Sequence, residues 1–183
     1  MKKFYAVILA SLAGTALLSG CTTDGGAKPS ATPAVSKPST ESGNSMPANS
    51  SQDLSSHITV SGGLGTEPQF GATQGAPPAE LVYQDLTVGN GVAALPASTL
   101  TVHYKLLTWS DGKIADSSWK SGSPATFPLA NVVKGWQEGL PGMKVGGRRL
   151  LIVPPALGYG SQDYGPIKGN ETLVFVVDLL EVK

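Results

Sequence analysis

The stretch from Val132 to Gly160 holds the residues of this chain that are best suited to forming a binding site. Trp136 lies on a segment whose apolar residues fall on one helical face, and Tyr159 lies between two glycines in a loop. A large aromatic surface and a phenol hydroxyl can hold an apolar group and donate a hydrogen bond to it. The stretch therefore predicts a pocket.

The sequence lacks the residue patterns of most other kinds of functional site. No His, Cys or carboxylate cluster has the spacing of metal ligands, and no Gly-x-Ser-x-Gly elbow occurs. The run 62–65 lacks the strand-to-helix setting that a phosphate-binding loop needs. Residues 79–183 carry nine Lys or Arg and nine Asp or Glu, so nothing suggests nucleic acid as a partner. We therefore expect no metal and no other cofactor.

The elements around the pocket follow from periodicity. Asn131 is a plausible N-cap for a helix that runs over Val132–Leu140 and stops at Pro141. Strict alternation over 100–106 predicts a half-buried strand with Thr101, His103 and Lys105 on its polar face, and one of Arg148 and Arg149 is expected to be exposed. The other predicted strands are 81–88, 125–129, 148–153 and 172–182. The predicted fold class is α+β, an antiparallel sheet with one short helix on its concave face.

Short blocks within Leu81–Lys183 occur in the order and near the spacing of one known family. They are Val102-His103-Tyr104, Asp111-Gly112-Lys113, Asp116-Ser117-Ser118, Val132-Val133-Lys134-Gly135-Trp136, Glu138-Gly139, Met143-Lys144-Val145-Gly146, Tyr159-Gly160 and Thr172-Leu173-Val174-Phe175. On these blocks the chain resembles the FKBP-type peptidyl-prolyl cis-trans isomerases. The resemblance implies a five- or six-stranded antiparallel half-barrel wrapped around the helix. It also implies isomerase activity that needs no cofactor.

The resemblance also implies a role for each pocket residue. Trp136 would be the floor under a prolyl ring, Asp116 a polar group at the rim, and Tyr159 a hydroxyl donor to a substrate carbonyl. The Val133 backbone N–H would be a second donor, and Ile167 would close the far side. The implied apolar walls are Tyr104, Val132, Val133 and Phe175. The expected partners are proline-containing unfolded or folding polypeptides, with macrolides directed at this family as further ligands, and the chain is expected to be a monomer.

The chain departs from the family at the wall of this pocket. Alanines, Ala115 and Ala125, occupy two positions where the family usually has an aromatic residue, and Ser121 aligns with a frequent arginine. We hypothesise that Trp119 fills the vacated space. Three functions stay open: an isomerase that assists the folding of secreted or cell-envelope proteins, a chaperone module that binds proline segments with weak or no isomerase activity, and a structural lipoprotein with a degenerate pocket.

The N-terminal part predicts an anchor. Residues 1–20 have the basic start, apolar run and small-residue end of a signal peptide with a lipoprotein cleavage site, followed by Cys21, the only cysteine. Acyl chains such as palmitate on Cys21 would hold the protein on the cell membrane or an outer membrane, with the domain outside the cytoplasm. Residues 21–56 predict a disordered tether, residues 57–78 an uncertain extended segment, and residues 79–183 the isomerase domain.

Overall fold

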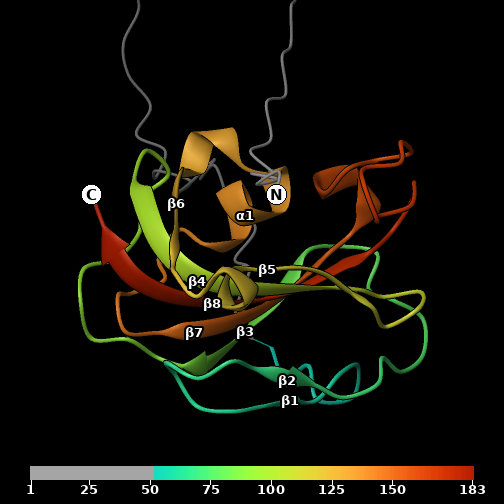
Figure 1. Ribbon diagram of the computed structural model, residues 1–183, viewed down its shortest axis with the longest axis horizontal. Coiled ribbons are helices and arrows are strands. Elements are labelled where there is room, and N and C mark those ends of the chain that lie inside the picture. The colour runs from blue at the N-terminus through green and yellow to red at the C-terminus, as the bar shows by residue number, and fades with distance from the viewer. Residues whose placement is uncertain (1–51) are drawn as a thin grey trace, which may run out of the picture. The chain divides into compact units, whose positions relative to one another are not determined.

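The structure, a computed structural model, describes residues 52–183. The predicted signal peptide, Cys21 and nearly all of the predicted tether lie outside the described residues. Within the described part, six strands form one antiparallel sheet, and a single short α-helix, α1 (Lys134–Gly139), lies against it. The predicted α+β fold is confirmed, and Figure 1 shows α1 on one side of the curved sheet. Residues 52–183 contain no helix that is both long and apolar enough to cross a membrane.

The sheet has the strand order β3-β7-β8-β4-β5, and β6 pairs with the first part of β4. Its strands are β3 (Val82–Thr87), β4 (Thr99–Thr108), β5 (Ile114–Ser117), β6 (Ala125–Pro128), β7 (Arg148–Val153) and β8 (Leu173–Val182). Three short 3-10 helices connect them: η1 (Ser118–Ser121), η2 (Leu129–Asn131) and η3 (Pro155–Leu157). The two ten-residue strands, β4 and β8, pair along nearly their whole length and form the centre of the sheet.

The central strands are buried on both faces. Every residue of β7 and the first seven residues of β8 are buried, which explains why these strands read as nearly continuous apolar runs. Alternate residues such as Leu151 and Phe175 face the main core under α1. Their neighbours, such as Ile152 and Val174, face a second core on the opposite side. The sheet therefore needs a covering layer on each face.

Helix α1 covers the concave face and lies close to β7 because two of its residues have no side chain. A Cβ atom on Gly135 would come within 2.4 Å of Val153, and one on Gly139 would come within 2.5 Å of Leu151, closer than real Cβ atoms approach. Arg149 of β7 adds a polar contact, since its Nη1 donates to the Gly139 carbonyl over 2.6 Å. These contacts fix the helix against the sheet.

The start of this helix differs from the expected one. Asn131, the predicted N-cap, ends η2, and Val133 takes the N-cap position with an extended backbone and no side-chain hydrogen bond. The Gln137 side chain, one helical turn on, donates instead to the carbonyls of Ala130 and Val132. The helix ends before Pro141, as predicted.

Residues 52–74, which we call the N-terminal strap, cover the other face of the sheet. They include a hairpin of β1 (Val60–Ser61) and β2 (Gln69–Phe70), which lies on the side of the sheet away from α1 (Figure 1). Leu54 and Ile58 are 2% and 1% exposed and pack in the second core with apolar side chains of β7 and β8. The folded domain therefore begins before the predicted boundary at residue 79, and residues 52–56 belong to it.

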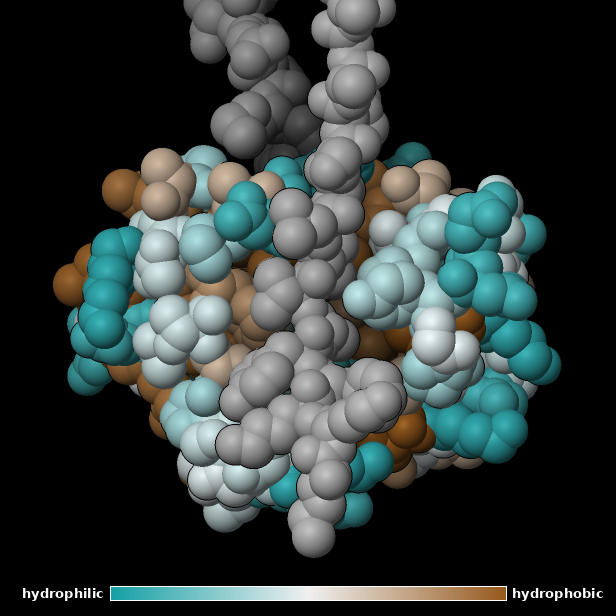
Figure 2. Space-filling model, turned by 45° about the horizontal axis from the view of Figure 1, so that its top comes forward, coloured by the Kyte–Doolittle hydropathy of each residue, from teal (hydrophilic) through white to brown (hydrophobic). Residues whose placement is uncertain are grey.

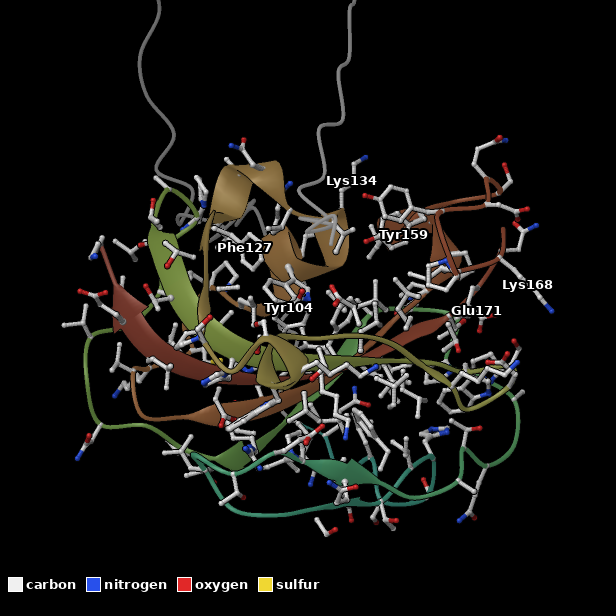
Figure 3. All side chains as sticks on the ribbon, in the orientation of Figure 1. Tyr104, Phe127, Lys134, Tyr159, Lys168 and Glu171 are labelled. Atoms are coloured by element: carbon white, nitrogen blue, oxygen red, sulfur yellow. The ribbon has the colours of Figure 1, made fainter. Side chains whose placement is uncertain are left out.

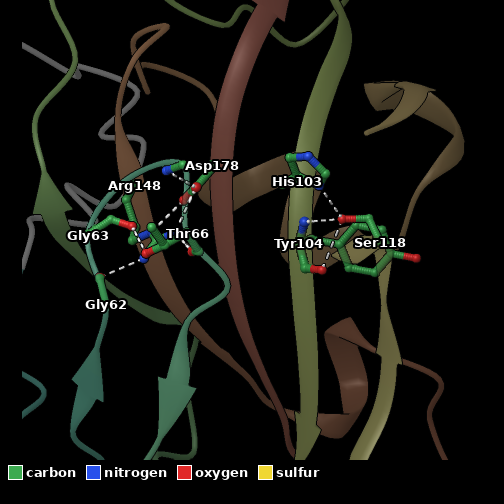
Figure 4. Close-up of polar contacts among 9 residues, drawn as sticks. Gly62, Gly63, Thr66, His103, Tyr104, Ser118, Arg148 and Asp178 are labelled. Carbon is green, nitrogen blue, oxygen red and sulfur yellow. Dashed lines mark hydrogen bonds and ion pairs between the residues drawn. The ribbon is translucent and has the colours of Figure 1, made fainter. Parts of the chain in front are cut away.

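A buried ion pair clamps the strap onto the sheet. Arg148 donates to the Asp178 carboxylate through Nε and Nη2 at 2.5 and 2.7 Å. Its Nη1 and Nη2 also donate to the carbonyls of Gly62 and Thr66 at 2.7 and 2.6 Å (Figure 4). The Gly65 N–H donates to Asp178 over 3.1 Å. The carbonyl groups of this glycine-rich turn thus accept hydrogen bonds from a buried guanidinium.

The strap also explains why the expected polar face of the sheet is buried. Arg148 is 1% exposed beneath the strap, and Arg149 is 4% exposed on the opposite face, where it contacts Gly139 of α1 and Asp85, so neither is the solvent-facing residue that the alternation predicts. Lys105, predicted to be exposed, is 7% exposed and donates from Nζ to the strap carbonyl of Pro68 over 2.9 Å. It also pairs with Glu67 at 2.9 Å. The alternation finds the correct face of the strand, but that face is covered by protein rather than by water.

Candidate active site

A pocket of about 110 Å³ opens between α1, the concave face of the sheet and the loop after β7. Its lining consists mainly of aromatic and aliphatic side chains with a few polar groups: Tyr104, Leu106, Asp116, Thr126, Phe127, Pro128, Asn131, Val132, Val133, Trp136, Tyr159 and Phe175. Figure 3 shows Tyr104 and Phe127 on the sheet side of α1 and Tyr159 on the neighbouring loop. Seen from the α1 side, apolar surface coloured brown lies among hydrophilic residues (Figure 2).

Trp136 forms the floor of the pocket within a ring of aromatic edges. Its ring meets Tyr104, Phe127 and Phe175 at centroid distances of 5.6, 6.0 and 5.4 Å, with interplanar angles of 84°, 82° and 75°. Edge-to-face pairs of this kind each contribute about 0.5–1.5 kcal/mol beyond the area they bury. Within the described residues the buried Nε1–H of Trp136 has no hydrogen-bond partner. The floor is thus an indole ring that contacts three other aromatic rings.

Tyr104 and Asp116 form the main polar contact at the wall. The Tyr104 hydroxyl donates to Asp116 Oδ2 over 2.5 Å, and Asp116 Oδ1 accepts the Ser117 N–H over 2.8 Å. Burial, together with this hydrogen bond, raises the pKa of Tyr104 well above that of a free phenol. The phenol therefore stays protonated at neutral pH and holds the carboxylate in place.

The segment that carries Asp116 is held to β4 by a second set of hydrogen bonds. Ser118 Oγ accepts the backbone N–H of Tyr104 over 2.9 Å and lies 2.9 Å from Nδ1 of His103 (Figure 4). The imidazole ring stacks on Trp119 at a centroid distance of 4.0 Å and an interplanar angle of 15°. Trp119 is therefore engaged on the side of β4 away from the pocket. The hypothesis that it fills the space beside Ala115 is wrong.

Two donors at the pocket have no hydrogen-bond partner among residues 52–183. Neither the Tyr159 hydroxyl nor the Val133 backbone N–H makes a hydrogen bond with any other described residue. Burial, with smaller effects from Tyr164 and Asp116, raises the pKa of Tyr159, so its hydroxyl keeps its proton at neutral pH. Both groups can donate to a carbonyl oxygen of a ligand.

Most of the site residues inferred from the sequence meet in this pocket. Those that line it are Tyr104, Asp116, Val132, Val133, Trp136, Tyr159 and Phe175. Ile167 is 4% exposed in the same core as Trp136 but is not among the lining residues. No group of three or more His, Cys, Asp or Glu side chains gathers anywhere in residues 52–183 in a way that could hold a metal ion.

Sequence reasoning missed Phe127, which lines the pocket and meets both Tyr104 and Trp136 edge to face. Residues two apart on a strand share a face, so Phe127 follows Ala125 on the same side of β6, and this spacing was the available signal. Neither Ala115 nor Ala125 lines the pocket. Phe127 thus supplies part of the aromatic wall, two residues further along β6 than Ala125.

Known proteins have sequences similar to this chain. A family model described as FKBP-type peptidyl-prolyl cis-trans isomerase matches residues 91–180. The FK506-binding protein of Streptomyces anulatus is 42% identical over 120 residues, a match that covers 63% of this chain and 97% of that protein. FkpA of Escherichia coli, an FKBP-type peptidyl-prolyl cis-trans isomerase, is 46% identical over 103 residues, covering 56% of this chain and 38% of FkpA.

The crystal structure of FkpA from Escherichia coli has the same fold, with a TM-score of 0.54 and 45% identity over 56% of this chain and 48% of that one. The crystal structure of AtFKBP13 gives a TM-score of 0.53 at 31% identity and covers 58% of this chain and 96% of that one. The match to nearly the whole of a relative at 42% identity agrees with the sheet, the helix and the aromatic pocket. The chain belongs to the FKBP-type peptidyl-prolyl cis-trans isomerases.

Proposed function

We propose that this isomerase binds the prolyl ring of its substrate over Trp136 and assists the folding of secreted or cell-envelope proteins. The observation that carries the proposal is the floor of Trp136 ringed by the edges of three other aromatic side chains. A prolyl ring is compact and apolar, and its nitrogen carries no N–H that would be left unsatisfied in such a pocket. The pocket therefore suits proline better than any polar side chain.

The proposed mechanism needs no proton transfer at the reacting bond. Rotation about an X–Pro bond is slow because amide resonance must be broken, at a barrier of about 18–20 kcal/mol. The twisted state has lost the charge separation of the planar amide, so an apolar pocket favours it. The free donors of Tyr159 and Val133 can hold the flanking carbonyl groups in that geometry. Each roughly 1.4 kcal/mol of preferential stabilisation raises the rate tenfold.

The second candidate is a chaperone module that holds proline segments with little turnover, and Ala115 and Ala125 favour it because they thin the aromatic wall. A protease-coupled assay with proline peptides at micromolar protein separates the two functions. Catalysed isomerisation, inhibited by an unlabelled proline peptide, supports the enzyme. An uncatalysed rate together with suppressed aggregation of an unfolded protein contradicts it.

The FK506-binding relative suggests that a macrolide of that class occupies the same pocket and would also inhibit the isomerase activity.

The lipid anchor on Cys21 belongs to the same proposal. The leader-like residues 1–20 and the single cysteine support it, and a diacyl anchor is strong enough to hold the domain on a membrane outside the cytoplasm. The Cys21→Ser variant should move from the membrane fraction to the soluble fraction while its isomerase activity stays unchanged. Equal partitioning of the two forms would contradict the anchor.

A further inference from the structure

Tyr164 contacts the proposed donor residue Tyr159 directly. The two rings stack at a centroid distance of 4.4 Å and an interplanar angle of 6°. Tyr164 is 37% exposed and is not among the residues that line the pocket. It therefore has no assigned contact with a bound prolyl ring, and its visible role in the structure is the contact with Tyr159.

The loop holds Tyr164 at a fixed place. Tyr164 and Ile167 exchange two backbone hydrogen bonds of 2.8 and 3.0 Å, and the Ile167 side chain is buried in the main core. Across the base of the loop the Asn170 N–H donates to the Gly160 carbonyl over 2.7 Å. The Tyr164 ring is thus attached, through a two-residue turn, to a side chain that cannot move without disturbing the core.

Tyr159 needs such a support because no hydrogen bond to another residue in the range 52–183 fixes its ring. Its hydroxyl makes no hydrogen bond with any of residues 52–183, whereas the hydroxyl of Tyr104 is held by Asp116. A phenol that is held only by packing can swing, and its oxygen then leaves the position at which a substrate carbonyl would accept. A displacement of about 1 Å at a reacting site can cost about a hundredfold in rate.

We propose that Tyr164 is a positioning residue that fixes the ring of Tyr159, so that the free hydroxyl points at the substrate carbonyl. The inference rests on the proposed role of Tyr159 as a donor in the isomerase reaction. The contact is made by the two ring faces, so the Tyr164 hydroxyl is dispensable and its ring is not. A stacked pair of this kind corresponds to a loss of about two- to tenfold in rate when one ring is removed.

The test is a double-mutant cycle on kcat/KM for a proline peptide. Tyr164→Leu should lower kcat/KM about two- to tenfold, while Tyr164→Phe should keep it near that of the native protein. In the Tyr159→Phe background, Tyr164→Leu should have no further effect, because there is no hydroxyl left to position. Lys168→Ala, an exposed change in the same loop, serves as the control and should change nothing.

A loss of equal size in both backgrounds would overturn the proposal, and so would no loss in either. Urea unfolding of each variant shows whether a loss of activity reflects a loss of fold. If the native protein does not catalyse isomerisation at all, the proposed function of Tyr159 fails, and the role of Tyr164 is tested by NMR of the free protein instead. Tyr164→Leu must shift the ring protons of Tyr159 and speed its ring flips, and unchanged Tyr159 signals would refute the positioning role.

Discussion

The N-terminal strap should contribute to stability as a part of the core, and Leu54→Ala tests this. Leu54 is 2% exposed in the second core, so the substitution removes a side chain that is almost wholly out of water. Leu→Ala changes at such sites cost about 2–5 kcal/mol. Domains of this size have a total stability of about 5–15 kcal/mol, so one strap residue should account for a large share of it.

Urea denaturation of the native protein and the variant gives the measurement. With a slope of about 2 kcal/mol per molar urea, the expected loss lowers the midpoint by about 1–2.5 M at an unchanged slope. Leu95→Ala is a matched control, because it removes the same atoms from a side chain that is 64% exposed. It should change the stability by no more than about 0.5 kcal/mol.

A midpoint for Leu54→Ala equal to that of Leu95→Ala would refute the reasoning, because the strap would then be a passive appendage. Truncation to residues 79–183 is the more severe form of the same test. It exposes the second core and removes the carbonyl partners of Arg148 and Lys105. We expect the truncated chain to unfold in far less urea than residues 52–183, and equal midpoints would again refute the account.

Three further predictions concern charges and protons. Asp178→Asn leaves the Arg148 guanidinium buried without its counter-charge, so urea unfolding at neutral pH should show a loss of about 3–5 kcal/mol; an unchanged midpoint would contradict the clamp. Because the pKa of Tyr104 is raised in the folded state, the unfolded state loses this proton at a lower pH than the folded state does. The free energy of unfolding should therefore fall as the pH rises above about 10, and it should fall less steeply in Tyr104→Phe. Identical alkaline unfolding profiles of the two proteins would contradict this. Hydrogen bonds from Lys113 and Thr108 lower the pKa of the exposed Asp111 to about 2 from 3.8. The contribution of Asp111 to stability is therefore present above about pH 4 and is lost as the pH falls toward 2. Asp111→Asn should flatten that part of the acid unfolding curve.

The elements that repeat a local pattern could be predicted from the sequence. The strand 148–153 has the predicted bounds, and β3, β4, β6 and β8 differ from the predictions by a few residues at most. Each of these strands alternates or runs apolar over its own length, so the signal does not depend on the rest of the chain. The start of α1 was misplaced because Asn131 resembles an N-cap, whereas the chain inserts the turn η2 before the helix.

The strap could not be predicted because its role depends on contacts far along the chain. The run 62–66 contains three glycines and no large polar group, and only the fold brings Arg148 and Asp178 beside its backbone. The burial of Lys105 has the same origin. An alternating pattern tells which residues share a face of a strand, and a tertiary contact decides whether water or protein covers that face.

The site was predicted where a family motif names the residue, as for Trp136 and Tyr159. Phe127 had a local signal in its spacing from Ala125. Tyr164 had none, because its contact with Tyr159 depends on the closed loop between Gly160 and Asn170. Such loop contacts follow from hydrogen bonds that no sequence periodicity reports.

The apolar pocket over Trp136 should isomerise X–Pro bonds without moving a proton. The most direct measurement is kcat/KM for a proline peptide in H₂O and in D₂O, with the native protein and with Trp136→Leu. We expect nearly equal rates in the two solvents for the native protein and a rate at least about tenfold lower in the variant, which loses the aromatic floor. A rate that falls severalfold in D₂O, or an unchanged rate in Trp136→Leu, would contradict it.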